Sequence, residues 1–374
     1  PQQPGALFSA SMIRLTEVTK TFPGTAKPAV DRLSLEVAEG EVVVLVGPSG
    51  CGKTTTLKMI NRLIEPTGGT INVAGRDILS LQAHELRRGI GYVIQQIGLF
   101  PHKTIGENIA TVPHLLGWDN ARTAARVGEL AEMVELSSEM LDRYPAELSG
   151  GQRQRVGVAR ALAADPPVLL MDEPFGAVDP IVRANLQDEL IALQSRLRKT
   201  IVLVTHDIDE AIKLGDRVAI LSEGGHLEQY DPPAEILRNP ANAFVADFLG
   251  SDRGIKRLSL IPLSAIKLDP GPILSRAATR EEAASVMARY GIEWAAIGDG
   301  TRVEGWFTAT DLQTHDTLEH ITAREFQIRL SPDASLREAL DAVITSHTAV
   351  AAVFDGDRYL GMATVQEISR EILQ

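Results

Sequence analysis

Residues 47 to 54 read Gly-Pro-Ser-Gly-Cys-Gly-Lys-Thr and match the pattern G-x-x-x-x-G-K-[ST]. This pattern constrains the fold because the loop must turn its backbone N–H groups inward around a polyanion, with dihedral angles that glycine tolerates best. An apolar run, residues 41–46, precedes the loop, and a segment with helical spacing of apolar residues follows it. An ordinary glycine-rich turn is the alternative, but it does not require these flanks. The sequence therefore predicts an α/β fold with a phosphate-binding loop between a buried strand and a helix.

The residue types of this loop suit a nucleotide and Mg²⁺. Lys53 supplies a charge for the β- and γ-phosphates, Thr54 supplies a hydroxyl for Mg²⁺, and the following helix offers the positive end of its dipole. Cys51 is the one cysteine of the chain, which excludes an internal disulfide and fits a reducing compartment. It is either a small loop filler or a site of oxidation or alkylation. The residues expected to contact the nucleotide are Gly47, Pro48, Ser49, Gly50, Cys51, Gly52, Lys53, Thr54 and Thr55.

The length and charge of the chain limit the classes of protein to which it can belong. At 374 residues it suits two or three domains, each with a core of its own. With 37 Lys and Arg against 49 Asp and Glu, the net charge of -12 disfavours nucleic acid as a general partner. The sequence has no run of about 18 apolar residues and no signal pattern over residues 1–11, which predicts a cytoplasmic chain.

Residues 168–173, Val-Leu-Leu-Met-Asp-Glu, form an apolar run that ends in two acids. This is typical of a central parallel strand that delivers carboxylates at its C-terminal edge. Asp172 would hold Mg²⁺ through water, and Glu173 would polarise the attacking water. An ordinary strand end is the alternative, but the position downstream of a phosphate loop favours the catalytic interpretation.

The segment Leu-Ser-Gly-Gly-Gln, residues 148–152, stands between these two parts and opens a helical pattern. Ser149 and two glycines at a helix start make a second anion cradle, with a plain small-residue cap as the alternative. With this pentapeptide the chain resembles the nucleotide-binding subunits of ATP-binding cassette (ABC) transporters. The resemblance implies that ATP is bound between two chains arranged head to tail. In such a pair the γ-phosphate of one chain is reached by Ser149, Gly150, Gly151 and Gln152 of the other.

The resemblance assigns further roles, one residue at a time. Phe22 would stack on adenine, unless it is a core residue. Gln95 would contact Mg²⁺ and the catalytic water, although its neighbour Gln96 is a second match. Asp179 would cross to the partner chain, and His206 would bond the γ-phosphate.

The same resemblance predicts the organisation of residues 12–250 as a P-loop NTPase of the ABC type. It implies a RecA-like core, an antiparallel β subdomain, and a helical subdomain at about residues 102–164. The apolar turn Gly98–Pro101 becomes a candidate dock for the coupling helix of a membrane subunit, with a buried loop hydrophobe as the alternative.

A repeat follows in the last third of the chain. Thr308-Ala-Thr-Asp311 and Thr364-Val-Gln-Glu367 are offset by 364 − 308 = 56 residues, and several other pairs share this offset. The prediction is a linker at 251–257, one copy at 258–320 and a second at 321–374. Each copy is expected to form a helix (279–290 and 335–347), two strands around an acidic-glycine turn, and T-x-x-[DE] opening a second helix.

The two copies resemble a tandem pair of CBS (cystathionine-β-synthase-type) domains, an α+β module that binds adenosine-containing ligands. The implied ligand is an adenine nucleotide or a cyclic dinucleotide, and the repeat would then regulate the ATPase. T-x-x-[DE] is equally a plain capping box, and the second copy has Glu where the family usually has Asp. The candidate ligand residues are Thr308, Asp311, Thr364 and Glu367.

The combination of an ABC ATPase with a C-terminal CBS pair resembles the ATPase of importers for glycine betaine, choline, carnitine and proline. The segments 94–102 and 105–110 also resemble this branch of the family. The resemblance implies ATP and Mg²⁺ as cofactors, and a place on the inner face of the cell membrane. It also implies three partners: a second copy of the chain, integral-membrane permease subunits and a solute-binding protein. The alternatives are the ATPase of a different importer, a soluble ABC-type mechanical ATPase acting on macromolecules, and a nucleotide-sensing regulator.

Overall fold

The computed structural model describes residues 11–95, 98–176 and 178–373, so the alternative Gln96 lies outside the described residues. The chain divides into two compact units at Leu249–Gly250. Within the described ranges, no helix combines the length and the apolarity needed to span a bilayer.

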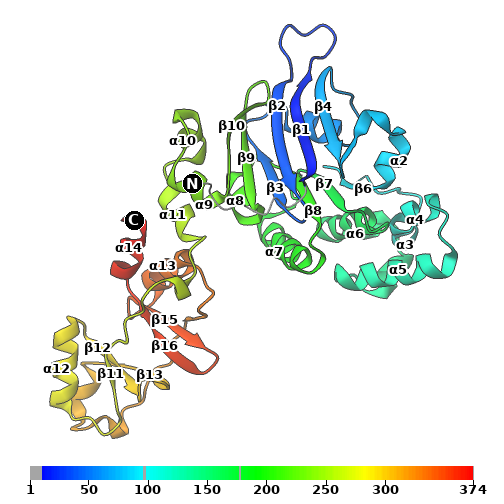
Figure 1. Ribbon diagram of the computed structural model, residues 1–374. Coiled ribbons are helices and arrows are strands. Elements are labelled where there is room, and N and C mark those ends of the chain that lie inside the picture. Colours follow the sequence, from blue (N-terminus) through cyan, green and yellow to red (C-terminus); the bar gives the residue numbers. More distant parts are fainter. Residues whose placement is uncertain (1–10, 96–97, 177, 374) are drawn as a thin grey trace, which may run out of the picture. The chain divides into compact units, whose positions relative to one another are not determined.

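The first unit is built on a mostly parallel sheet with the strand order β10-β9-β3-β8-β7-β6 (Figure 1). The run that precedes the phosphate loop is its buried strand β3, whose neighbours β8 and β9 are both parallel to it. Because the carboxyl ends of parallel strands meet at one edge, the segments after β3, β6, β7 and β8 are brought together there. The strands are β3 (Val42–Val46), β6 (Ile90–Val93), β7 (Val168–Asp172), β8 (Thr200–Val204), β9 (Arg217–Ser222) and β10 (His226–Asp231).

A second, antiparallel sheet has the order β2-β1-β4-β5 and corresponds to the predicted β subdomain. Its inward side chains, such as Ile13 and Leu35, share one hydrophobic core with Leu45 of β3 and Leu170 of β7. This common core fixes the antiparallel sheet to the central parallel sheet. The strands are β1 (Ser11–Lys20), β2 (Val30–Ala38), β4 (Gly68–Val73) and β5 (Arg76–Asp77).

Helices α3 to α6 occupy most of residues 102–164, where the helical subdomain is predicted. In Figure 1 the teal helices α3 to α5 and the blue antiparallel strands lie on different sides of the central sheet. The helices of the first unit are α1 (Lys53–Ile60), α2 (Ala83–Arg88), α3 (Ile105–Ile109), α4 (Thr111–Leu115), α5 (Asn120–Met133), α6 (Gly150–Leu162), α7 (Pro180–Leu197), α8 (Ile208–Leu214), α9 (Pro233–Arg238) and α10 (Ala243–Leu249).

The second unit repeats one arrangement, as the 56-residue offset predicts. In each copy a short strand pairs in parallel with the next strand, which pairs in antiparallel fashion with a third. The registers Ile273↔Ala296 and Arg329↔Ala352 are themselves 56 residues apart. The elements are β11 (Ile273–Leu274), α12 (Arg280–Tyr290), β12 (Trp294–Gly298) and β13 (Val303–Thr308), then β14 (Arg329–Leu330), α13 (Leu336–Thr345), β15 (Ala351–Asp355), β16 (Arg358–Ala363) and α14 (Val365–Leu373).

The prediction of a second helix in both copies is wrong for the first copy. Thr364 is followed by α14, but Thr308 is followed by a 3₁₀ turn at Asp311–Thr314. Residues 313–317, Gln-Thr-His-Asp-Thr, offer no apolar stripe that a helix could bury. In the second copy Ile368 supplies such a contact and is fully buried.

The predicted irregular linker at 251–257 is also wrong, because helix α11 (Arg253–Leu258) forms there. Leu258 is fully buried and joins the core of the second unit with Leu336 and Ile368. Lys256, which looks like a solvated linker residue in the sequence, is buried and lies 3.0 Å from the carboxylate of Asp252. The polar composition therefore concealed a short helix that begins the second unit.

Candidate active site

The side chain of Lys53 is hydrogen-bonded to the backbone of the phosphate loop that contains it. Gly52 has φ 105°, and a Cβ there would lie 2.4 Å from the carbonyl oxygen of Ala29, so no larger residue fits. The Nζ of Lys53, a buried residue, donates to the carbonyl oxygens of Gly47 at 2.7 Å and Pro48 at 3.0 Å. The ammonium charge is thus held inside the loop, at the start of α1.

Thr54 and Asp172 meet across the sheet edge, as expected of two groups that share one cation. The hydroxyl of Thr54 donates to Oδ1 of Asp172 at 2.9 Å. Burial raises the pKa of Asp172, and the Thr54 hydrogen bond opposes the rise. Hydroxyl and carboxylate oxygens are the ligand types that Mg²⁺ takes, so the pair fits this ion.

Glu173 lies between two of the predicted catalytic partners. Its carboxylate accepts a hydrogen bond from Nε2 of Gln95 at 3.0 Å and lies 3.3 Å from Nδ1 of His206. Glu173 has φ 45°, a conformation that costs a non-glycine residue free energy and that clusters at functional sites. Its N–H bonds the carbonyl oxygen of Val204 at 2.9 Å, which holds it to the strand that ends beside His206.

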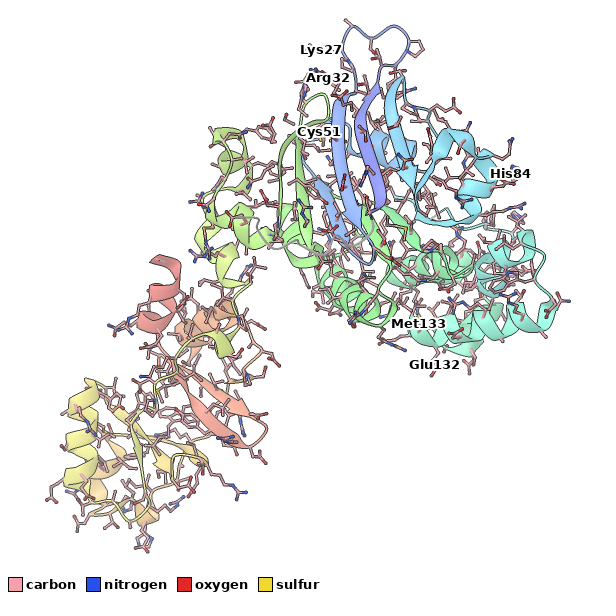
Figure 2. All side chains as sticks on the ribbon, viewed as in Figure 1. Lys27, Arg32, Cys51, His84, Glu132 and Met133 are labelled. Carbon is pink, nitrogen blue, oxygen red and sulfur yellow. The ribbon has the colours of Figure 1, made fainter. Side chains whose placement is uncertain are left out.

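The aromatic and sulfur groups near the loop differ in exposure. Phe22 is partly exposed, with Nζ of Lys20 5.2 Å from its ring centroid, so it is not a core residue. Cys51, labelled in Figure 2, is 1% exposed and its Sγ lies 3.7 Å from Nζ of Lys53. This burial supports the loop-filler interpretation of Cys51. Thr55 is half-buried in the first turn of α1.

The signature segment forms a helix cap. The hydroxyl of Ser149 accepts the N–H of Gln152 at 3.3 Å, and Oε1 of Gln152 accepts the N–H of Ser149 at 2.9 Å, a capping box at the start of α6. Asp179 similarly caps α7 by accepting the N–H of Val182 at 3.1 Å. Within the described part of the chain, no hydrogen bond joins these caps to the phosphate loop.

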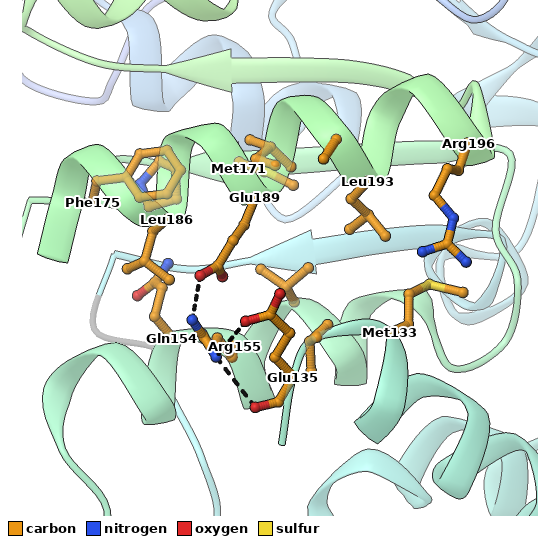
Figure 3. Close-up of a pocket in the computed structure, with 15 residues that line it drawn as sticks. Met133, Glu135, Gln154, Arg155, Met171, Phe175, Leu186, Glu189, Leu193 and Arg196 are labelled. Carbon is orange, nitrogen blue, oxygen red and sulfur yellow. Dashed lines mark hydrogen bonds and ion pairs between the residues drawn. The ribbon is translucent and has the colours of Figure 1, made fainter. Parts of the chain in front are cut away.

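The signature helix is tied to α7 by an ion pair that the sequence does not reveal. Figure 3 shows Arg155 of α6 between Glu189 of α7 and Glu135, whose carbonyl oxygen accepts from Arg155 at 3.2 Å. Beside this cluster lies a cavity of about 150 Å³, lined partly by Gln154. The link means that α6 and α7 are held together both by packing and by charge.

The candidate ligand residues of the second unit are engaged with their own chain. Oδ2 of Asp311 accepts from the N–H and the hydroxyl of Thr308, both at 2.8 Å, which is half of a capping box. Arg324 pairs with the same carboxylate through both terminal nitrogens, at 2.6 and 3.0 Å, and lies over the ring of Trp306. The first copy therefore presents a neutralised carboxylate.

In the second copy the carboxylate of Glu367 accepts from both the N–H and the hydroxyl of Thr364. In both copies, therefore, the carboxylate of T-x-x-[DE] accepts from the threonine three residues earlier, as it would in a capping box. A separate cavity of about 560 Å³ opens beside Arg324, and its lining includes Trp306, Arg324, Phe326, Ser346, His347 and Thr348.

Comparison with known proteins gives two matching family models and several relatives of similar length. The model described as ABC transporter matches residues 30–176, and the model described as CBS domain matches residues 323–374, the second copy. The osmoprotectant import ATP-binding protein OsmV of Salmonella typhimurium is 46% identical over 97% of this chain and 95% of its own length. The chain belongs to the family of ABC transporter ATP-binding subunits. This confirms the predicted family and the predicted ATPase class.

A second relative of this ABC subunit, the carnitine transport ATP-binding protein OpuCA of Listeria monocytogenes, is 45% identical over 94% of the chain and 90% of its own length. Among solved structures, the dimeric structure of a bacterial ABC transporter cassette is 37% identical, with a TM-score of 0.54. It covers 59% of this chain and 99% of the solved chain. The solved fold confirms the predicted cassette architecture of the first unit.

The sequence does not reveal the pairing of Arg324 with Asp311, because Arg324 lies in an irregular stretch 13 residues after Asp311. Its guanidinium lowers the pKa of Asp311 to about 2 from 3.8. Since the folded pKa lies below the unfolded one, this pair stabilises the second unit above about pH 4, and the contribution is lost as the pH falls toward 2.

Arg324→Gln should raise the pKa of Asp311 toward its ordinary value, measured by NMR titration of ¹³C-labelled aspartate carboxyls in the full chain. Arg329→Gln, which breaks the exposed pair of Arg329 with Asp357, is the matched control and should leave Asp311 unchanged. An unaltered Asp311 titration in Arg324→Gln would contradict the assignment.

Proposed function

We propose that this chain is the ATP-hydrolysing subunit of an ABC importer for an osmoprotectant such as glycine betaine, choline, carnitine or proline. The observation that carries the hydrolytic part is the carboxylate of Glu173 between Gln95 and His206, at the edge where the phosphate loop ends. The solute class is supported by the names of relatives, which include osmoprotectant import and carnitine transport subunits. A glycine betaine/carnitine/choline transport subunit of Bacillus subtilis is a further relative, 58% identical over 66% of this chain and 64% of its own length.

The chemistry follows from the positions of the side chains. Lys53 and the loop N–H groups would bind the phosphates, and Thr54, Asp172 and Gln95 would hold Mg²⁺, which would supply neutralisation of phosphate charge. Glu173 accepts a proton from the attacking water while Gln95 keeps the carboxylate oriented. His206, which lies beside Oε1 of Glu173 while Gln95 bonds Oε2, would hydrogen-bond the γ-phosphate.

The proposed active form is a dimer of this subunit on the inner face of the cell membrane. Ser149, Gly150, Gly151 and Gln152 of one chain complete the phosphate site of the other, and Asp179 crosses between the chains. A solved cassette structure that is 36% identical to this chain, with a TM-score of 0.54, is described as a dimer bound to ADP and Pi. This likeness supports a dimer as the active form.

Permease subunits would dock on the turn that contains Phe100, and a solute-binding protein would deliver the solute to them. Phe100 is 40% exposed, which supports an accessible hydrophobe over a buried one. The turn is held in place by Asn108, a fully buried residue whose Oδ1 accepts the N–H of Phe100 at 2.8 Å. A pre-formed apolar tip of this kind suits the coupling helix of a membrane protein.

The second unit would regulate the ATPase by binding an adenine nucleotide or a cyclic dinucleotide. The cavity beside Arg324 offers the rings of Trp306 and Phe326 for stacking, and a phosphate would compete with Asp311 for the guanidinium of Arg324. Calorimetry of the full chain in the Lys53→Met background, where the catalytic site is disabled, would test this part. Absence of heat with both ligand classes would contradict it.

Reconstituted uptake tests the proposed function as a whole. The chain, its permease subunits and its solute-binding protein are placed in vesicles with ATP on the chain's side, and a panel of labelled osmolytes is supplied. ATP-dependent uptake of a quaternary amine or proline is the expected result. Uptake of another solute class with none of these would contradict the substrate assignment and leave the ATPase assignment intact.

A further inference from the structure

We propose that Arg183 and Glu210 are positioning residues for His206, because they clamp residues 205–207 to helix α7 directly behind Asp179. The inference rests on the proposed function, since it concerns the same hydrolytic site. The two residues lie on different helices, α7 and α8, and among the described residues no hydrogen bond or ion pair joins either to the phosphate loop. They form two layers of one link, an outer ion pair and an inner buried hydrogen-bonded set.

The outer layer joins the residues that flank Asp179 and His206. Nη2 of Arg183 donates to the carbonyl oxygen of Val178 at 3.4 Å, and its Nη1 lies 3.8 Å from Oδ2 of Asp207. Both side chains are about one-third exposed, at 32% and 36%. Asp207 is in turn the N-cap of α8. Arg183 therefore connects the backbone just before Asp179 to the residue just after His206.

The inner layer lies one helical turn further along α7 and is buried. Nε2 of Gln187 donates to Oε1 of Glu210 at 3.3 Å, and the two residues are 7% and 6% exposed. The Thr205 side chain beside Glu210 favours the charged form of its carboxylate, while burial raises the pKa of Glu210. The hydroxyl oxygen of Thr205 accepts the N–H of Asp207 at 3.1 Å. The contacts that run from Gln187 to Asp207 therefore hold Thr205 and Asp207, the two residues that flank His206 in the sequence.

This link matters for His206 because packing does not fix its ring. The imidazole side chain is 59% exposed, yet its Nδ1 lies 3.3 Å from the carboxylate of Glu173. With so little contact of its own, the ring takes its direction from the backbone of residues 205–207. The backbone is held by Glu210 through Thr205 and by Arg183 through Asp207.

Helix α7 also contacts the signature helix, so the link to His206 extends to the signature segment. At its first turns α7 contacts the signature helix, where a Cβ added to Gly151 would lie 2.9 Å from Cγ1 of Val182, and its middle carries the Glu189–Arg155 pair. The same helix therefore packs on the signature segment on one side and on the His206 segment on the other. Engagement of Asp179 and the signature segment by a partner chain would bear on the His206–Glu173 geometry through Arg183 and Gln187.

The test compares the kinetics of ATP hydrolysis by full-length variants. Arg183→Met and Glu210→Ala should each lower kcat about tenfold or more while the Kd for ATP is unchanged, because the phosphate loop is untouched. Glu210→Gln keeps an oxygen for the Thr205 hydroxyl and should recover most of the rate. Asp188→Asn is the matched control: it breaks the 2.7 Å pair of Lys213 with Asp188, which joins the same two helices away from residues 205–207, and should leave kcat unchanged.

A double-mutant cycle separates positioning from general destabilisation. If Arg183 acts through His206, Arg183→Met should cause little further loss in a His206→Ala background, measured by single turnover with labelled ATP. An additional loss equal to that in the wild-type background would overturn the inference, as would a kcat for Arg183→Met equal to that of Asp188→Asn. Arg183→Met keeps the test decisive should Glu210→Ala fail to fold. A wild-type chain without hydrolysis would instead refute the proposed function.

Discussion

Glu173→Gln is expected to bind ATP with unchanged affinity and to hydrolyse it roughly 10²- to 10⁴-fold more slowly than the wild-type chain. In the proposed mechanism the carboxylate accepts the proton of the attacking water, and the amide cannot replace it in that role. The groups proposed to bind nucleotide lie elsewhere, on Lys53 and the loop. The side-chain amide still fits beside Gln95 and His206, so the change removes chemistry without removing volume. Steady-state hydrolysis and equilibrium binding of a fluorescent ATP analogue measure the two effects separately.

The same variant should accumulate as a dimer with trapped ATP, visible by size-exclusion chromatography with light scattering. Glu223→Gln is the control, because Glu223 is 89% exposed and its nearest cation, Lys27, lies 3.9 Å away at the surface. Near-wild-type hydrolysis by Glu173→Gln would remove Glu173 from its assigned role.

Lys53→Met is expected to lose nucleotide affinity by about 10²-fold or more. A hydrogen bond to a charged group contributes about 1.5–3 kcal/mol, and each 1.4 kcal/mol is about tenfold in affinity. The loss has a second source, because Nζ also bonds the carbonyl oxygens of Gly47 and Pro48 and so holds the loop in its binding shape. Methionine preserves the buried aliphatic stem but supplies none of these donors.

Isothermal titration calorimetry with ATP and Mg²⁺ measures this loss directly. Lys27→Met provides the control, since the Lys27 side chain is 87% exposed and removes the same charge from a surface position. Equal affinities for Lys53→Met and Lys27→Met would contradict the role of Lys53.

The catalytic core could be predicted from sequence because each of its parts is a short local pattern. The loop at 47–54 needs glycines at defined positions, and the acids Asp172 and Glu173 directly follow a continuous apolar run. Once these strands are parallel neighbours, their ends must meet, which brings Gln95 and His206 to the same carboxylate. Their spacing along the chain is large, but the sheet topology makes it irrelevant.

Contacts that depend on tertiary packing could not be predicted in the same way. Arg324 pairs with Asp311 across an irregular segment, and Lys256 is buried although residues 251–257 are mostly polar. Whether a second helix forms in the first copy depends on the apolar surface that the residues after Asp311 can bury. The T-x-x-[DE] pattern does not specify that surface, and a 3₁₀ turn forms there instead. The link from Gln187 to Glu210 likewise joins two helices whose packing angle no local pattern encodes.

The central claim, that each ATP site is shared by two copies of the chain, is tested most directly by mixing two inactive variants. Glu173→Gln disables the proposed hydrolytic carboxylate, and Gly151→Asp places a negative charge in the signature segment, which in the proposed dimer faces the partner's phosphates. A mixed dimer contains one site with the Glu173 of the second variant and the intact signature of the first. Hydrolysis in the mixture, well above that of either variant alone, is the result the shared site predicts. Mixed dimers confirmed by native mass spectrometry that hydrolyse no more ATP than the separate variants would contradict it.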